Sequence, residues 1–466
     1  MAYQRFKKVA LVVPASRRGY RFTSEPLNIG FIASFLEGYG IEVTIIDELA
    51  GQDVEKELLR YNPDLVGVTA TTPLAPRAYE IAKVCRSAGI TTVMGGVHAS
   101  VLPEEALQHF DIVVVGEGEA AMLDIVRNNI QSGIVTAPFI RDIDEIPPPA
   151  RHLIQMDFYF AIRNKLLPSL FRFAPFHARV ASMLTSRGCP YSCIFCYNSW
   201  KGIPFRFNSA ERVISEVKEL MRVYGVSAIF FIEDDFFANK PRFKKICELL
   251  IEEKLNLIWG ANARVDDISE NILRIAKEAG CREVVFGFES ASQRILDILN
   301  KKTTVEQNYK AVELCYKVGI SPQGTVMFGN PTETLEDIRA TQRFLWETRI
   351  KGVGVMITTP YPGTVLWDWC KEHSLIPSEV MWENLDHTSN LVIPACNTIS
   401  QREIEKLKFE TEAVIVGGDP LRLLTLIAKG LIPPKDIVRL LRNPLVVLHI
   451  LMKVLQSLVG LGYYWR

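Results

Sequence analysis

Residues 184–198 read LTSRGCPYSCIFCYN and follow an apolar, strand-like run that begins at residue 180. Cys189, Cys193 and Cys196 stand four and then three positions apart on a loop with glycine and proline, so their sulfurs can point at one centre. Thiolates suit iron–sulfur clusters, and a four-iron cluster with three protein ligands keeps one iron open. The loop therefore favours such a cluster over a zinc site, which needs a fourth ligand, or three unrelated buried thiols.

The composition limits the classes of partner and compartment. The 466 residues favour two or three domains. The 53 basic and 53 acidic side chains give a formal charge of +0, which leaves no basic footprint for nucleic acid. The cysteine count is odd, at 9, and those outside the loop are scattered singly, as free thiols in a reducing compartment are. Without an apolar signal segment at the N-terminus, a cytoplasmic protein is expected.

The first part of the chain, residues 1–140, alternates short apolar runs with helical patterns. This rhythm predicts an α/β domain with a doubly wound parallel sheet, which binds ligands beyond the carboxyl ends of its strands. The predicted strands are residues 9–13, 42–46, 65–70, 91–94 and 112–115, and the helices are 29–37, 54–61, 78–87, 104–109 and 119–128.

Small and glycine-rich residues follow three of these predicted strands. Glycine lets a backbone approach a flat ligand closely or adopt positive φ. A single such turn is common, but three at one edge indicate a binding site. The candidate cofactor-binding residues are Thr69, Thr71, Gly95, Gly96, Gly116, Glu117 and Gly118.

A proline-rich break near residue 147 starts a linker at 141–176, which reads as an aromatic strap between domains. Residues 177–370 then resume the alternation of strands and helices and predict a partial barrel with six strands. The predicted strands are 181–184, 228–232, 257–260, 283–288, 323–328 and 352–357, and the helices are 213–224, 242–253, 270–279, 305–318 and 335–348. The chemistry of such barrels lies at the carboxyl ends of the strands.

Charged residues and glycines fall at those strand ends. Acidic side chains there can accept hydrogen bonds from an ammonium group or ribose hydroxyls, and arginine can clamp a carboxylate. The alternatives are a helix cap for one aspartate, a surface salt bridge for the arginine and a structural role for the later glutamate. The candidates are Glu233, Asp234, Asp235, Arg264, Glu289, Ser290 and Gly329.

The cysteine spacing, with Arg187-Gly188 before it and an aromatic on each side of Cys196, resembles the signature of the radical S-adenosylmethionine (SAM) superfamily. The resemblance implies that the three cysteines bind a [4Fe–4S] cluster whose open iron chelates SAM, and that electron transfer yields a 5′-deoxyadenosyl radical. It also implies cofactor contacts from an acid within residues 233–235 and from the turn at 287–290, and a backbone contact with adenine near Gly329.

The first third of the chain resembles the cobalamin-binding domain that is fused to many radical enzymes. The match departs from the cobalamin mutases, because residues 14–19 read PASRRG and not Asp-x-His-x-x-Gly, so no histidine of that turn ligates cobalt. His98, in the turn at 95–100, can contact the cofactor, cap the next helix or lie exposed.

Residues 371–466 predict a mainly helical C-terminal region with a helix at 404–416. Residues 421–461 are unusually apolar, but polar residues interrupt them too often for a spanning helix. A helix on a membrane surface, the lining of a lipid-sized pocket and an ordinary packed helix are the alternatives. The expected location is therefore cytoplasmic, and association with a membrane surface is the alternative.

Residues 360–364, PYPGT, resemble an element of the branch that contains anaerobic porphyrin cyclase and hopanoid- and tetraether-lipid enzymes. The resemblance implies an enzyme with a cluster, SAM and cobalamin that methylates an unactivated carbon of a small hydrophobic, lipid- or isoprenoid-like substrate, with electrons from a flavodoxin- or ferredoxin-type donor. The alternatives are a radical oxidoreductase or cyclase, which would incorporate no labelled methyl group, and a non-catalytic iron–sulfur protein, which would not cleave SAM.

Overall fold

The structure, a computed structural model, describes residues 6–15, 24–170, 173–175, 177–197, 202–350, 352–385, 393 and 395–417, without side chains at 164–170, 414 and 416–417. The chain forms two compact units that alternate along the sequence. The first comprises residues 1–162, 182–216 and 359–393, and the second comprises 163–181, 217–358 and 394–466.

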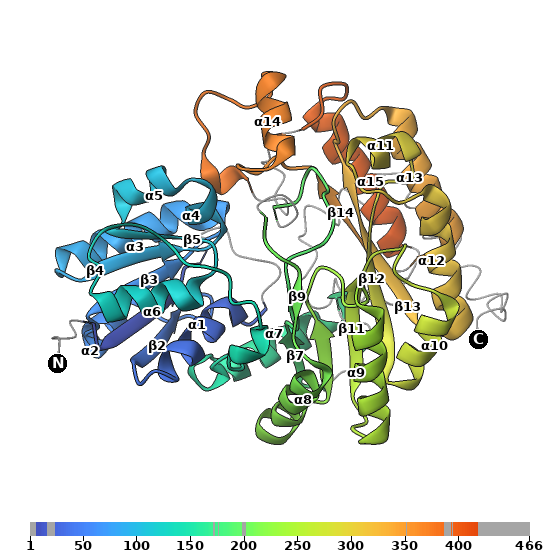
Figure 1. The fold of residues 1–466 in the computed structure, drawn as a ribbon. Helices are drawn as coiled ribbons and strands as arrows, with labels where there is room; N and C mark the ends of the chain where they lie inside the picture. Colours follow the sequence, from blue (N-terminus) through green and yellow to red (C-terminus); the bar gives the residue numbers. More distant parts are fainter. Residues whose placement is uncertain are drawn as a thin grey trace. The chain divides into compact units, whose positions relative to one another are not determined.

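The first unit contains sheet A, which has six parallel strands in the order β2-β1-β3-β4-β5-β6. Figure 1 labels β2, β3, β4 and β5 of this sheet. The strands are β1 (Lys8–Val13), β2 (Glu42–Asp47), β3 (Leu65–Thr69), β4 (Thr91–Gly95), β5 (Ile112–Val115) and β6 (Gly133–Thr136). The five expected strands are present. The sequence pattern missed β6, since this edge strand carries no buried residue and so lacks an apolar run.

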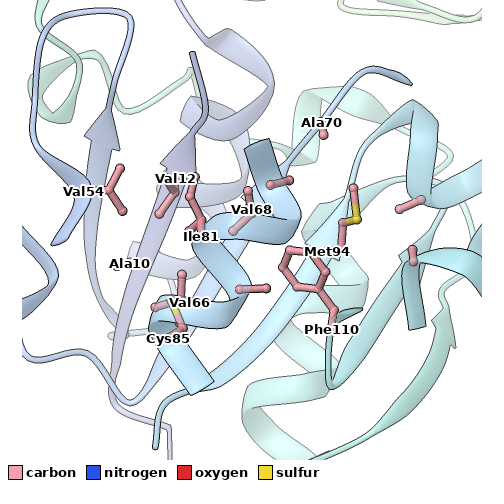
Figure 2. Close-up of a cluster of buried hydrophobic side chains, with 14 of the residues drawn as sticks. Ala10, Val12, Val54, Val66, Val68, Ala70, Ile81, Cys85, Met94 and Phe110 are labelled. Carbon is pink, nitrogen blue, oxygen red and sulfur yellow. The ribbon is translucent and has the colours of Figure 1, made fainter. Parts of the chain in front are cut away.

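Helices pack on both faces of sheet A. They are α1 (Leu27–Glu37), α2 (Val54–Tyr61), α3 (Ala75–Ser87), α4 (Val97–Val101), α5 (Pro103–His109) and α6 (Gly118–Asn128), with a 3₁₀ turn η1 (Thr72–Leu74). One buried cluster joins Val66 and Val68 of β3 to Ile81 and Cys85 of α3 and to Met94 of β4 (Figure 2). This core fixes the strands, and hence the turns that follow them.

The expected linker contains a helix. After the 3₁₀ turns η2 (Ile143–Glu145) and η3 (Arg151–Leu153), the chain forms α7 (Met156–Leu170). An aromatic residue anchors this helix, because the buried Tyr159 donates a hydrogen bond of 2.5 Å to Asp47 Oδ2 of β2. The domain boundaries at 140, 176 and 370 stay a prediction.

Sheet B has six strands in the order β14-β13-β12-β11-β10-β7, so neighbours in the sheet follow each other along the chain and confirm the expected partial barrel. The strands are β7 (Val180–Met183), β10 (Ala228–Phe231), β11 (Ile258–Ala263), β12 (Cys281–Glu289), β13 (Ser321–Phe328) and β14 (Gly352–Ile357). A small antiparallel pair, β8 (Ser186–Arg187) and β9 (Arg206–Phe207), lies outside both sheets.

The helices between these strands begin at well-formed caps. Thr304 and Thr334 each close a capping box with the residue three positions later. The helices are α8 (Ala210–Tyr224), α9 (Lys240–Glu252), α10 (Glu270–Glu278), α11 (Gln293–Ile298), α12 (Val305–Val318), α13 (Leu335–Thr348), α14 (Val365–Glu372) and α15 (Gln401–Gly417), with a 3₁₀ turn η4 (Trp382–Asn384). The apolar segment 421–461 lies outside the described residues. In the described part of the chain, no helix combines the length and apolarity that crossing a membrane requires.

Candidate active site: a cysteine loop and two strand edges

The cysteine loop belongs to the first unit. Gly188 opens it with φ +78°, and a Cβ there would lie 2.6 Å from Pro204 O, so the position requires glycine. Cys193 is 7% exposed, whereas Cys189 and Cys196 are half-buried. The Cys196 amide donates to Cys193 O at 3.2 Å, which turns the chain between the second and third cysteines.

The donor set fits an iron–sulfur cluster, because three thiols lie within eight residues of one loop and no cysteine that the structure describes forms a disulfide. Among the described residues, no group of three or more His, Cys, Asp or Glu side chains is placed to hold a metal ion. The assignment of Cys189, Cys193 and Cys196 as ligands therefore rests on their spacing and stays a prediction.

The carboxyl edge of sheet A consists largely of glycine backbone. Gly96 adopts φ +93° and ψ −174°, and a Cβ there would lie 2.8 Å from Ala70 O. A methyl group at Gly95 or Gly116 would meet no described atom within 4 Å. Backbone this accessible fits a large, flat ligand such as cobalamin. Gly118, in contrast, packs against α1, because a Cβ there would lie 2.5 Å from Ile32 Cδ1 and the isoleucine side chain would have to move.

The other candidates at this edge have partners of their own. Thr69 Oγ1 accepts from Asn28 Nδ2 at 3.2 Å, and Thr71 accepts the Leu74 amide at 2.9 Å as it starts η1. Glu117 forms ion pairs with two arginines, Arg187 and Arg206, which close the base of the cysteine loop. The structure thus brings the third glycine turn and the cysteine loop together.

His98 is fully buried rather than exposed. Its Nε2 lies 2.7 Å from the Tyr79 hydroxyl, which also contacts Glu105 Oε1 at 3.1 Å. Trp382 Nε1 donates to the same carboxylate oxygen at 2.7 Å. Burial raises the pKa of Glu105, but the neighbouring His98 and the hydrogen bonds from Trp382 and Tyr79 outweigh that and lower it.

The Tyr79 hydroxyl donates its hydrogen bond to the charged Glu105, so His98 donates from Nε2 to the hydroxyl oxygen. Its Nδ1 then finds no hydrogen-bond partner among the described residues. An orphaned buried acceptor of this kind costs about 1–3 kcal/mol, which is consistent with a position that faces a ligand or water. Sequence reasoning missed Tyr79, Glu105 and Trp382, since no local pattern links three residues so far apart.

In the second unit, the three acidic residues that follow β10 differ in solvent exposure. Asp234 is exposed, whereas Glu233 and Asp235 are 3% and 5% exposed. Asp235 Oδ1 accepts the Phe237 amide at 3.0 Å, which is a turn-forming contact. Burial, and after it the neighbouring Asp267, raise the pKa of Asp235 to about 9, so this carboxyl is protonated at neutral pH. Lys240 Nζ bonds to Asp267 Oδ1 at 2.7 Å.

Arg264 and Glu289 both bind the same residue, Lys301. Arg264 binds both carboxylate oxygens of Asp266 at 3.0 Å and donates to the carbonyl oxygen of Lys301 at 2.8 Å. Lys301 Nζ in turn lies 2.8 Å from Glu289 Oε1, and both side chains are 8% exposed. Glu289 sits at an irregularity in the pairing of β12 with β13 and has φ +57°, an uncommon value outside glycine. The backbone at the end of β12 therefore departs from regular strand geometry at Glu289.

Ser290 and Gly329 have structural partners. The fully buried Ser290 bonds to Thr341 of α13 at 3.2 Å. The amides of Gly329 and Asn330 both donate to Glu333 Oε2, at 2.6 and 3.0 Å, so this carboxylate holds the turn that follows β13. Burial is the main cause that raises the pKa of Glu333 to about 7. The expected cofactor contacts of the residues at this edge stay predictions.

Comparisons with known proteins agree with this arrangement. Residues 183–345 match the Radical SAM superfamily, and residues 18–126 match the B12 binding domain. An uncharacterised methyltransferase of Pyrococcus horikoshii is 34% identical over 79% of this chain and 84% of its own length. The anaerobic magnesium-protoporphyrin IX monomethyl ester cyclase of Rubrivivax gelatinosus is 30% identical over 72% of this chain and 64% of its own length.

Among solved structures, the cobalamin-dependent SAM radical enzyme OxsB, with aqua-cobalamin and SAM bound, superposes with a TM-score of 0.69 at 18% identity. The match covers 89% of this chain and 67% of OxsB and confirms the fold. The two matched domains give the chain its cofactors, a [4Fe–4S] cluster with SAM and cobalamin. By fold and by sequence, the chain belongs to the cobalamin-binding radical SAM enzymes, among methyltransferase and cyclase relatives.

Proposed function

We propose that this enzyme methylates an unactivated carbon of a hydrophobic, lipid- or isoprenoid-like substrate. The observation that carries the proposal is that the cysteine loop and the glycine edge of sheet A lie in one compact unit. The methyltransferase relative at 34% identity supports methyl transfer, and the PYPGT element at 360–364 supports a hydrophobic substrate.

The cofactors, when bound, supply a radical that removes hydrogen from the substrate and a methyl group that replaces it. The side chains of the protein would hold and orient these cofactors. Glu289 and Arg264, which are buried and fixed through Lys301, would bind the amine and carboxylate of SAM at the edge of sheet B. Gly95, Gly96 and Gly116 would let cobalamin approach the backbone of sheet A.

The test uses anaerobically reconstituted enzyme with hydroxocobalamin, dithionite and SAM that carries a trideuterated methyl group. An isoprenoid, a fatty-acyl lipid and a porphyrin ester serve as substrate probes. Methyl transfer predicts formation of 5′-deoxyadenosine together with a product in which one trideuterated methyl group replaces one hydrogen. If only the porphyrin ester gains the label, methyl transfer is supported and the proposed substrate class is wrong.

The second candidate is a radical oxidoreductase or cyclase, which the relative from Rubrivivax gelatinosus favours. It predicts 5′-deoxyadenosine and a product that has lost hydrogen and gained no label. A non-catalytic iron–sulfur protein predicts no 5′-deoxyadenosine at all. The flavodoxin- or ferredoxin-type donor belongs to the same proposal, and either protein replacing dithionite in this assay supports it.

A further inference from the structure

The cysteine loop is closed at its base by two facing arginines. Strands β8 and β9 pair antiparallel so that Arg187 lies opposite Arg206, and the three cysteines lie on the segment between them. Gly188 lets the two arms of this hairpin approach closely, because a Cβ at this position would lie 2.6 Å from Pro204 O. The position of the cysteines therefore depends on what holds these two arginines.

Both arginines bind Glu117 in the turn between β5 and α6, and Arg187 also binds Glu119 in the first turn of α6. Arg206 grips Glu117 with two hydrogen bonds, of 2.5 and 3.0 Å, to its two carboxylate oxygens. Arg187 lies 2.6 Å from Glu119 and 3.4 Å from Glu117. A paired, two-point contact of this type fixes orientation as well as distance.

These four charges are largely removed from water. The side chains of Arg187 and Arg206 are 14% and 8% exposed, and those of Glu119 and Glu117 are 4% and 21% exposed. Two cations and two anions balance each other, so the cluster of charges is stable only while all of its members are in place. We call Arg187, Arg206, Glu117 and Glu119 the arginine clamp.

The clamp starts in the glycine turn of sheet A. Gly116, with φ +96°, immediately precedes Glu117, and a methyl group there would meet no described atom within 4 Å. A ligand that settles on Gly116 would therefore restrict the backbone that carries Glu117 and Glu119. Ordering one end of the clamp lowers the entropic cost of ordering the other.

We propose that Arg187 and Arg206 are positioning residues that couple cobalamin binding at the β5–α6 turn to the placement of the [4Fe–4S] cluster. This inference rests on the proposed function, because it assumes that cobalamin occupies the glycine edge of sheet A. Coupling of this kind is reciprocal: a chain that carries the cluster binds cobalamin more tightly than the same chain without it.

The experiment measures the dissociation constant of hydroxocobalamin by visible absorbance for the full chain with and without its cluster. The wild-type ratio of the two constants is expected to be about 10, within the usual range of coupling between two sites. In Glu117→Gln the ratio falls to about 1, because the anchor shared by both arginines is lost. A cofactor contact by Glu117 itself would weaken binding equally in both forms and leave the ratio unchanged.

The matched control is Glu216→Gln, which removes the partner of Arg151 in a buried ion pair of 2.6 Å in the same unit. It should keep the wild-type ratio with a comparable loss of thermal stability. Arg206→Lys keeps the charge but loses the planar fork, so its ratio should lie between those of the wild type and Glu117→Gln. If Glu117→Gln fails to fold, the ratio measured for Arg206→Lys tests the coupling instead.

A wild-type ratio of 1, or a ratio that Glu117→Gln and Arg206→Lys leave unchanged, would overturn the coupling while the proposed function stands. A ratio that falls equally in Glu216→Gln would also overturn it, because any buried ion pair would then have the same effect. Wild-type protein that binds no cobalamin in either form would overturn the proposed function and the clamp together.

Discussion

The carboxyl edge of sheet A presents bare backbone, whereas that of sheet B presents buried charges. At sheet A, methyl groups at Gly95 and Gly116 would meet no described atom within 4 Å. At sheet B, Glu289 and Lys301 form an ion pair that is largely shielded from water. Both edges end parallel strands in the same alternation of strands and helices, so the topology alone does not decide what kind of ligand an edge receives.

The difference lies in what must be in place before a ligand binds. A glycine edge needs little side-chain order, and it suits a large ligand that is held along its periphery. A charged edge must first satisfy its own charges, because an unpaired buried ion is costly. Sheet B meets this requirement by binding Arg264 to Asp266 and Glu289 to Lys301. The contrast predicts different outcomes when each edge is changed.

The largest effect is expected at the cysteine loop. Cys193→Ala removes one of three predicted cluster ligands, so iron content and formation of 5′-deoxyadenosine should both fall to background. Cobalamin supplied in excess should still bind, since the glycine edge is intact. Iron and cobalt analysis together with chromatography of the nucleoside checks this result. Cys85→Ala, which removes a buried thiol from the core of sheet A, is the control and should keep its iron.

At sheet B, Glu289→Gln leaves the buried ammonium of Lys301 without its carboxylate partner. The expected cost is about 3–5 kcal/mol of unfolding free energy, the usual penalty for breaking a buried pair from one side. Denaturant titration measures it. Glu289→Gln combined with Lys301→Met removes both charges and should restore most of the stability.

The same double variant separates a structural role of Glu289 from cofactor binding. If Glu289 contacts SAM, the double variant stays weak in SAM affinity, measured by calorimetry, although its stability returns. Recovery of both quantities together would show that the pair is structural, and the predicted cofactor contact would then be wrong.

Most of the fold could be predicted because its strands are buried runs at regular intervals. Residues 323–328 and 352–357, for example, fall within or coincide with β13 and β14. Helix α7 was missed because its aromatic residues suggested a strap, and nothing local shows that Tyr159 would bond to Asp47 of β2. Periodicity reports burial along one segment and carries no information about which segment provides the partner.

The site could be predicted only where the chemistry is local. The cysteine loop and the glycine turns are continuous motifs, so the sequence offers them as candidates, and their roles as ligands stay predictions. The sequence did not predict the arginine clamp. Glu117 was a candidate cofactor ligand, and its ion pair with Arg206 joins residues that are 89 positions apart. Composition shows which charges exist, but only the fold pairs them.

At sheet A, Gly96→Ala tests whether the glycine edge depends on backbone geometry. Its φ of +93° with ψ of −174° is open almost only to glycine, and the new Cβ would lie 2.8 Å from Ala70 O. A loss of roughly 2–3 kcal/mol and weaker binding of cobalamin are expected. Gly51→Ala is the control, because φ there is +86° but a Cβ would meet no described atom within 4 Å.

Gly51→Ala should lose only about 1–2 kcal/mol and keep its affinity for cobalamin. Thermal unfolding and absorbance titration of the two variants give both comparisons. Equal affinity in the two variants would contradict the assignment of Gly96 to the binding edge.

At sheet B, a change of slope with pH is expected, which is the smallest effect when it is counted per pH unit. Burial and then Asp267 raise the pKa of Asp235 to about 9 from an ordinary value of 3.8. The native state therefore keeps a proton that the unfolded chain has lost. The stability that this proton contributes is complete below about pH 4 and is lost progressively as the pH rises towards the native pKa. Asp235→Asn has no such proton, so its stability should gain on the wild type by about 1.4 kcal/mol per pH unit.

Denaturant titrations of the wild type and Asp235→Asn at about pH 6, 7 and 8 measure this slope. Asparagine keeps an acceptor for the Phe237 amide, so the difference isolates the proton rather than the turn. Parallel curves for wild type and Asp235→Asn would mean that Asp235 is ionised beside Asp267 in the native state. Lys240 would then have to balance two carboxylates, and the charged edge of sheet B would attract a cationic ligand more strongly than its protonated form does.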